Sequence, residues 1–154
     1  DLHKSIFSPH YLKQYNNRWF VLGAVSGFES STTYALDRIH SLSESSATYQ
    51  ASSIDYEEHF EDVIGVTVPN ETRLEKIVLK VNAGLYPYIK TKPLHGSQKV
   101  KEVNEDYSII ELTVYPNYEL ESVLLSFGES IEVMRPDSLR EKLKERLQNA
   151  VKNY

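Results

Sequence analysis

Apolar and polar positions along the first forty residues predict a β-meander. The longest nearly unbroken apolar run, 18–25, contains the only tryptophan, Trp19, and aromatic and β-branched residues of this kind favour strands. The small polar segment 26–33 is typical of a hairpin loop, and it leads into a second strand-like run, 34–39. Ahead of Trp19, the run 11–15 ends at two turn-forming asparagines, which completes an order of strand, turn, strand, loop, strand.

The middle of the chain has a weaker pattern that predicts a connector. The segment 43–53 is rich in Ser, Ala and Thr and contains few apolar residues. From Asp55 to Gly65 the apolar residues recur at helical spacing, with Asp55 suited to the start of a helix and Gly65 to its end. We therefore expect a short helix that links two domains.

Beyond Arg73 the apolar period changes several times between the values for strands and for helices. The four predicted strands are 74–81, 100–103, 110–114 and 131–134. The three predicted helices are 83–90, 116–127 and 136–154. The last helix carries an apolar stripe, formed by Leu139, Leu143, Leu147 and Val151. The order β-α-β-β-α-β-α is that of a ferredoxin-like unit with an added C-terminal helix.

These patterns predict an α+β fold with two domains and a connection. Residues 1–53 form a small β-barrel or β-sandwich, residues 54–72 form the connecting helix and linker, and residues 73–154 form a ferredoxin-like α/β domain.

The composition excludes several classes of site. The chain has 154 residues and no cysteine, which excludes disulfides and thiolate metal sites. Its net charge of −5 argues against a surface built broadly for duplex DNA. The longest apolar run is far shorter than the roughly 18 residues of a membrane-spanning helix, so we expect no membrane contact. Because Met134 is the only methionine, we interpret Asp1 as the start of a fragment of a longer protein.

Catalytic motifs are missing from the sequence. There is no Gly-rich phosphate loop, no nucleophile elbow and no His-Glu-x-x-His pair, and the five histidines have no ligand spacing. The sequence therefore predicts a protein without catalytic residues, a bound metal or a cofactor.

One cluster of basic residues surrounds the loop 93–98. A Gly-Ser loop flanked by lysines is able to meet phosphates through backbone N–H groups and charge. The candidate residues of this secondary basic loop are Lys92, His95, Ser97 and Gln98. The alternative is an ordinary exposed loop.

Trp19 also has two interpretations. A large aromatic residue in a short strand is usually a core residue. Alternatively, Trp19 is a platform on which a nucleobase stacks while Arg18 and Arg38 hold its phosphate. Continued strand alternation through 34–39 places Tyr34 and Arg38 on one face and Asp37 on the other.

The tryptophan strand and the motif Leu36-Asp37-Arg38-Ile39 together resemble the WYL family of bacterial regulators, with Trp19-Phe20-Val21 in place of the eponymous tripeptide. The segments 74–81, 93–98 and 136–154 resemble the extension called WCX that often follows a WYL domain. The resemblance implies a small SH3/Sm-like β-barrel followed by the ferredoxin-like WCX domain. It also implies an upstream DNA-binding domain and an effector that is a single-stranded nucleic acid or a nucleotide. The ligand-binding residues that it implies are Arg18, Trp19, Phe20, Tyr34 and Arg38.

The chain departs from the family pattern at three of these motif positions. Family members often carry arginines where this chain has Thr32 and Ala35, and Phe20 lacks the hydroxyl of the usual tyrosine. The departures predict a less basic pocket than the family pattern implies.

We therefore expect a cytoplasmic, non-enzymatic fragment of a bacterial transcriptional regulator that senses a ligand and forms a homodimer. The alternative is a protein-interaction or structural module in which Trp19 is a core residue and no small ligand binds.

Overall fold

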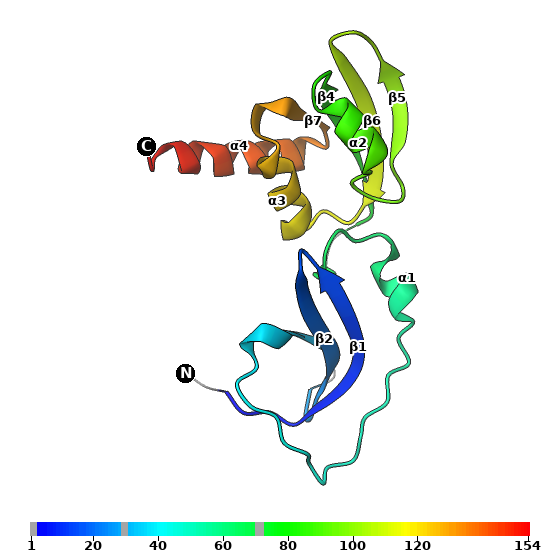
Figure 1. Ribbon diagram of the computed structural model, residues 1–154, viewed down its shortest axis with the longest axis vertical. Coiled ribbons are helices and arrows are strands. Elements are labelled where there is room, and N and C mark those ends of the chain that lie inside the picture. Colours follow the sequence, from blue (N-terminus) through cyan, green and yellow to red (C-terminus); the bar gives the residue numbers. More distant parts are fainter. Residues whose placement is uncertain (1–2, 29–30, 70–72) are drawn as a thin grey trace. The chain divides into compact units, whose positions relative to one another are not determined.

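The computed structural model describes residues 3–28, 31–69 and 73–154 (Figure 1). The chain divides into two compact units, 1–59 and 60–154, which are described separately below. Helices and antiparallel sheets are both present, so the expected mixed α+β class is confirmed.

The first unit contains an antiparallel sheet of three strands in the order β1-β2-β3. These strands are β1 (Phe7–Tyr15), β2 (Arg18–Val25) and β3 (Ser31–Ala35). Asn16 and Asn17 join β1 to β2 with φ values of 51° and 61°, the left-handed backbone that a two-residue hairpin requires. Among the described residues β1 does not pair with β3, so this sheet is open and the expected closed barrel is not formed.

The third strand is displaced from the predicted run 34–39, because it begins at Ser31, inside the expected loop 26–33. β3 ends at Ala35, and Leu36–Arg38 forms a single 3-10 turn, η1, which is closed by a bond from the Ile39 N–H to the Leu36 carbonyl at 3.2 Å. The expected alternation through 34–39 is therefore wrong beyond Ala35, because a helical turn does not alternate its side chains.

Hydrogen bonds hold the coil that follows η1 against β1. The Ser8 hydroxyl accepts a bond from the Gln50 N–H at 3.0 Å, and the Tyr49 hydroxyl donates to the Pro9 carbonyl at 3.0 Å. His10 Nε2 lies 2.6 Å from the Gln50 carbonyl oxygen, so this nitrogen carries a proton. The coil leads into α1 (Tyr56–Glu61), which is shorter than the predicted helix from Asp55 to Gly65.

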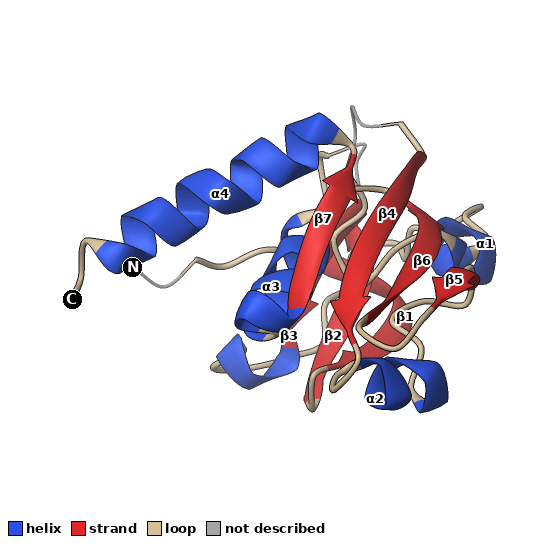
Figure 2. Ribbon diagram, turned by 90° about the horizontal axis from the view of Figure 1, so that it is seen from above, coloured by secondary structure: helices blue, strands red, loops and turns tan. Residues whose placement is uncertain are grey.

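The second unit has the element order that the sequence predicted, β-α-β-β-α-β-α (Figure 2). Its strands are β4 (Glu75–Asn82), β5 (Lys99–Val103), β6 (Tyr107–Val114) and β7 (Ile131–Arg135). Its helices are α2 (Tyr86–Thr91), α3 (Tyr118–Ser126) and α4 (Asp137–Val151), with a short 3-10 turn, η2 (Gly128–Ser130). The strands form one antiparallel sheet in the order β5-β6-β4-β7.

Alternation along the two central strands produces the core of this unit. On β4 every second residue is fully buried, namely Ile77, Leu79 and Val81, and on β6 the same holds for Ile110, Leu112 and Val114. Because successive side chains of a strand point to opposite faces, the remaining residues lie on the other face of the sheet.

The C-terminal helix is tied to α3 by a buried carboxylate. Glu121 is 3% exposed, and its two oxygens meet Lys142 Nζ at 2.5 Å and Arg146 Nη1 at 2.8 Å. Leu139 and Leu143 are buried, whereas Leu147 and Val151 are 49% and 71% exposed. The predicted apolar stripe on this helix is therefore covered over its first half only.

The segment 64–67 is fastened to the start of α3. The Asn117 amide donates to the carbonyls of Ile64 at 2.8 Å and Thr67 at 2.9 Å, while its oxygen caps α3 through the Leu120 N–H. Glu119 Oε1 accepts three bonds, from the Val66 N–H and from the N–H and hydroxyl of Thr67. This part of the expected connector is therefore bonded into the second unit.

Gly65 permits this close approach. Its φ is +89°, and a Cβ built on it would lie 2.5 Å from Glu119 Cγ. Only a residue without a side chain satisfies both conditions.

We expect Gly65→Ala to lower the free energy of unfolding by more than about 2 kcal/mol, because it adds an overlap with Glu119 to the strain of a left-handed backbone. Gly128→Ala is the control, since Gly128 also has a positive φ, +54°, but a Cβ there meets nothing within 4 Å. Urea denaturation monitored by circular dichroism measures both. Equal losses of stability in the two variants would contradict the close contact.

Candidate functional site

The register of β2 distributes the predicted ligand-binding residues over two faces of the first sheet. Trp19 lies opposite Gln14, and Val21 lies opposite both Leu12 and Tyr34. Directly opposed residues share a face, so Trp19 and Tyr34 lie on one face of the sheet, called here the Trp face. Arg18 and Phe20 alternate with Trp19 and therefore lie on the other face.

One end of the Trp face is packed and the other is open. At the packed end the rings of Phe7 and Tyr34 meet edge to face at 5.2 Å, and the Phe7 ring covers Gly23, where a Cβ would lie 2.5 Å from it. At the open end Trp19 is 48% exposed and Leu12 is 55% exposed. The interpretation of Trp19 as a core residue is therefore wrong, and its ring is accessible for stacking.

On the opposite face Arg18 forms an ion pair with the 3-10 turn. Its Nη2 lies 3.0 and 2.8 Å from the two carboxylate oxygens of Asp37, and its guanidinium carbon lies 5.7 Å from the centre of the Phe20 ring. Arg38 follows Asp37 in η1 and is exposed. The structure thus brings Arg18, Phe20 and Asp37 together and does not bring Arg18 to Trp19.

This ion pair changes the acidity of Asp37. The hydrogen bond from Arg18 is the largest cause that lowers the pKa of the Asp37 carboxyl, and the positive charges of Arg18 and Arg38 act in the same direction. A carboxyl whose pKa is lower in the folded state stabilises the fold above its unfolded-state pKa. This stabilisation is lost as the pH falls through the folded-state pKa.

Lys13 is a further residue of the face that carries Arg18 and Phe20, and it was not among the residues predicted from the sequence. It lies opposite Phe20 in the register of β1 and β2, and partial burial lowers its pKa. Tyr15 lies opposite Arg18, and Lys13 is two residues before Tyr15 on the same strand. Strand alternation along 11–15 is therefore the sequence signal that would have placed Lys13 on this face.

The secondary basic loop uses its polar side chains within the second unit. His95 Nε2 lies 2.8 Å from the Glu61 carbonyl oxygen, and His95 Nδ1 lies 2.8 Å from the Ser97 hydroxyl. Ser97 in turn donates to the Thr113 carbonyl and accepts from the Thr113 N–H. His95 and Ser97 therefore hold backbone groups in place. Gln98 is the third of the four predicted side chains that does so.

The amide of Gln98 donates to the Ile89 carbonyl at 3.1 Å, and its oxygen accepts from the Leu94 N–H at 3.0 Å. Lys92 differs, since its ammonium lies 5.8 Å from the centre of the Tyr88 ring in a cation–π contact. The Lys92 side chain thus contacts an aromatic ring, whereas the other three side chains bond to backbone.

The part of the chain that the structure describes contains neither a metal cluster nor a membrane-spanning helix. No group of three or more His, Cys, Asp or Glu side chains is arranged to hold a metal ion there. No helix within the same residues is long and apolar enough to cross a membrane.

We expect Arg18→Gln to raise the pKa of Asp37 toward the ordinary value of an aspartate, because the variant removes both the charged hydrogen-bond donor and its charge. Arg38→Gln is the control and has a smaller effect, since Arg38 acts on Asp37 through charge alone. Carboxyl carbon chemical shifts recorded by NMR over the acid pH range measure this. A larger change in the Arg38 variant would contradict the Arg18–Asp37 pair.

Comparison with known proteins bears mainly on the second unit. No curated protein matches the chain. Among solved structures the chain is similar to proteasome accessory factor B/C (PafBC) of Arthrobacter aurescens, with 15% identity and a TM-score of 0.43, over 92% of this chain and 22% of that one. The chain thus spans about a fifth of the length of PafBC.

Residues 73–151 match the family model of the WCX domain. This segment runs from two residues before β4 to the end of α4, and it covers just over half of the chain. The chain therefore belongs to the WCX domain family.

Proposed function

We propose that the chain is the ligand-sensing part of a bacterial transcriptional regulator, and that a single-stranded nucleic acid or a nucleotide binds to the Trp face of its first unit. The half-exposed ring of Trp19 carries this proposal. Base stacking on an exposed aromatic residue is a common way to bind unpaired bases, and it tolerates different sequences because every base has a π face.

The domain arrangement that supports this proposal is the one expected from the sequence. Residues 1–53 are a WYL-type module of the SH3/Sm-like kind, residues 54–72 connect it, and residues 73–154 are a ferredoxin-like WCX domain. The strand order β5-β6-β4-β7 with its two intervening helices supports the ferredoxin-like assignment. A DNA-binding domain precedes these parts in the whole protein, which is cytoplasmic and without enzymatic activity.

The five ligand-binding residues have different roles in this proposal. Trp19 and Tyr34 share the Trp face and supply aromatic contact. Arg38 supplies the charge that attracts phosphate. Arg18 and Phe20 lie on the other face, where the bond from Arg18 to Asp37 positions the turn that carries Arg38.

The secondary basic loop has a lesser role. Lys92 supplies a positive charge for phosphate groups that meet the second unit, while His95, Ser97 and Gln98 hold the loop in shape through the bonds described above.

Regulation requires that the effector distinguish two states of the protein. In a homodimer, an effector that binds one arrangement more tightly than another shifts the population toward that arrangement. The spacing of the two DNA-binding domains then changes, and with it the affinity for a two-part DNA site.

A second function is supported by the same surface. Leu12 and Trp19 are both about half exposed on the Trp face, and exposed apolar residues that lie together are typical of protein interfaces. The alternative is therefore a protein-interaction or structural module that binds no small ligand.

We expect single-stranded DNA or RNA, or a nucleotide, to quench Trp19 fluorescence in a saturable way that weakens as salt is raised. Trp19→Ala, measured by binding of a dye-labelled oligonucleotide, should lower the affinity about fivefold or more, because stacking contributes about 1–3 kcal/mol per base. Arg38→Ala should weaken binding and reduce the salt dependence.

Lys152→Gln is the matched control for Arg38→Ala, since Lys152 is also exposed but lies at the end of α4 in the second unit. A Trp19 signal that responds to none of these ligands would exclude the nucleic-acid sensor and favour the interaction module.

A further inference from the structure

Gln14 is the polar side chain that lies directly opposite Trp19 in the first sheet. The register of β1 and β2 pairs the two residues, so they share the Trp face. Both are exposed, Trp19 with 48% of its surface. Within the described residues no side-chain hydrogen bond uses the Gln14 amide. A ligand that lies on the Trp19 ring therefore has a free amide beside it.

The hairpin brings these two side chains close together. The loop 16–17 has two residues, so Tyr15 and Arg18 are the closing pair, which is hydrogen-bonded in a loop of this kind. Hydrogen-bonded and non-hydrogen-bonded pairs alternate along antiparallel strands, which makes Gln14 and Trp19 a non-hydrogen-bonded pair. The Cα atoms of such a pair are about 4.5 Å apart, and its side chains lie closer together than those of a hydrogen-bonded pair.

The other neighbours of Trp19 on β1 and β2 are apolar on this face. Val21 is two residues further along the same strand and is buried, and Leu12 lies diagonally across on β1 and is 55% exposed. Neither side chain offers a hydrogen bond. Of these three neighbours, Gln14 is therefore the one that is able to recognise polar atoms at the edge of a stacked ligand.

A glutamine amide matches the edge of an unpaired base. The amide holds a donor group beside an acceptor, and every base has a donor next to an acceptor on its Watson–Crick edge. That edge is occupied in a duplex and free in a single strand. A phosphate group has acceptors alone, so it is able to use only the donor half of the amide.

We infer that Gln14 hydrogen-bonds the Watson–Crick edge of a base that stacks on Trp19, and that this contact makes the Trp face selective for unpaired bases. The inference rests on the nucleic-acid sensor proposed above and adds the group that recognises the base. Stacking alone accepts any flat aromatic group, whereas the paired bonds of an amide require polar atoms at the edge of that group.

The test compares the binding of two short, dye-labelled oligonucleotides to the full 154-residue chain by fluorescence anisotropy. One is oligothymidylate. The other has the same length and backbone, but each base is replaced by indole, which stacks and has no hydrogen-bonding atom on its edge. Gln14→Met should weaken binding of oligothymidylate about threefold to tenfold, which corresponds to the loss of about one net hydrogen bond. The same variant should leave binding of the indole oligonucleotide unchanged.

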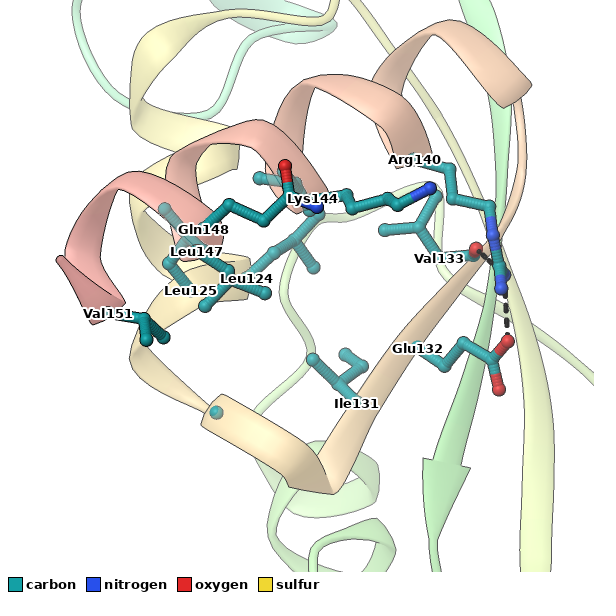
Figure 3. Close-up of a pocket in the computed structure, with 12 residues that line it drawn as sticks. Leu124, Leu125, Ile131, Glu132, Val133, Arg140, Lys144, Leu147, Gln148 and Val151 are labelled. Carbon is teal, nitrogen blue, oxygen red and sulfur yellow. Dashed lines mark hydrogen bonds and ion pairs between the residues drawn. The ribbon is translucent and has the colours of Figure 1, made fainter.

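Two further variants are measured with both oligonucleotides. Trp19→Ala should weaken both, because both stack on the ring. Gln148→Met is the matched control and should weaken neither, since Gln148 is an exposed glutamine of α4 that lines an apolar groove of the second unit (Figure 3). Gln14 is exposed on β1, so its Met variant is expected to fold, which circular dichroism verifies.

A modified base tests the same contact without a variant. Oligonucleotides of 3-methylthymine lack the donor of the Watson–Crick edge. The unaltered chain should bind them more weakly than oligothymidylate, and Gln14→Met should then have little further effect, because one partner of the hydrogen bond is already missing.

Two outcomes would overturn this inference while the sensor stands. In the first, Trp19→Ala weakens binding of oligothymidylate but Gln14→Met is as harmless as Gln148→Met. In the second, Gln14→Met weakens both oligonucleotides equally, which would make Gln14 a support for the strand and not a contact to the base. If the unaltered chain binds neither oligonucleotide, the sensor itself fails and the role of Gln14 fails with it.

Discussion

The alternation of side chains along paired strands is the constraint on which both units depend. In β4 and β6 it buries one row of aliphatic residues completely and thereby produces the core of the WCX domain. In β2 it separates residues that are neighbours in sequence, because Arg18 and Trp19 point to opposite faces of the sheet. The pairing of β2 with β1 and β3 fixes which face each residue occupies. As a result, one face carries the exposed ring of Trp19 and the other carries the Arg18–Asp37 pair.

Polar side chains then hold the irregular segments that the strands leave open. Asn117 and Glu119 bind the backbone of 64–67 to the start of α3, and His95 and Ser97 bind a loop to the backbone of Glu61 and Thr113. A buried backbone group without a partner is costly, so side chains of this kind stabilise loops that have no ladder of their own. The same kind of bond explains why three of the four predicted side chains of the secondary basic loop bind backbone groups of the protein itself.

The Trp face offers an accessible aromatic ring on one side of the first sheet. The Arg18–Asp37 pair lies on the other side and holds the turn that carries Arg38. The two sides of this one sheet therefore offer different chemistry, an aromatic surface on one and a charged pair on the other.

The sequence by itself determined the order of elements and the WCX membership of residues 73–151, because periodic apolar patterns and short motifs are local properties. It also predicted the meander and the strands 74–81 and 110–114, which correspond to β4 and β6. Only the tertiary structure decided that the third strand begins at Ser31 and stops at Ala35, that Trp19 is half exposed, and that Arg18 meets Asp37. These facts depend on which strand lies opposite which and on what covers each face. The partial exposure of α4 arises for the same reason, since its apolar stripe is continuous in sequence but is covered only over its first half.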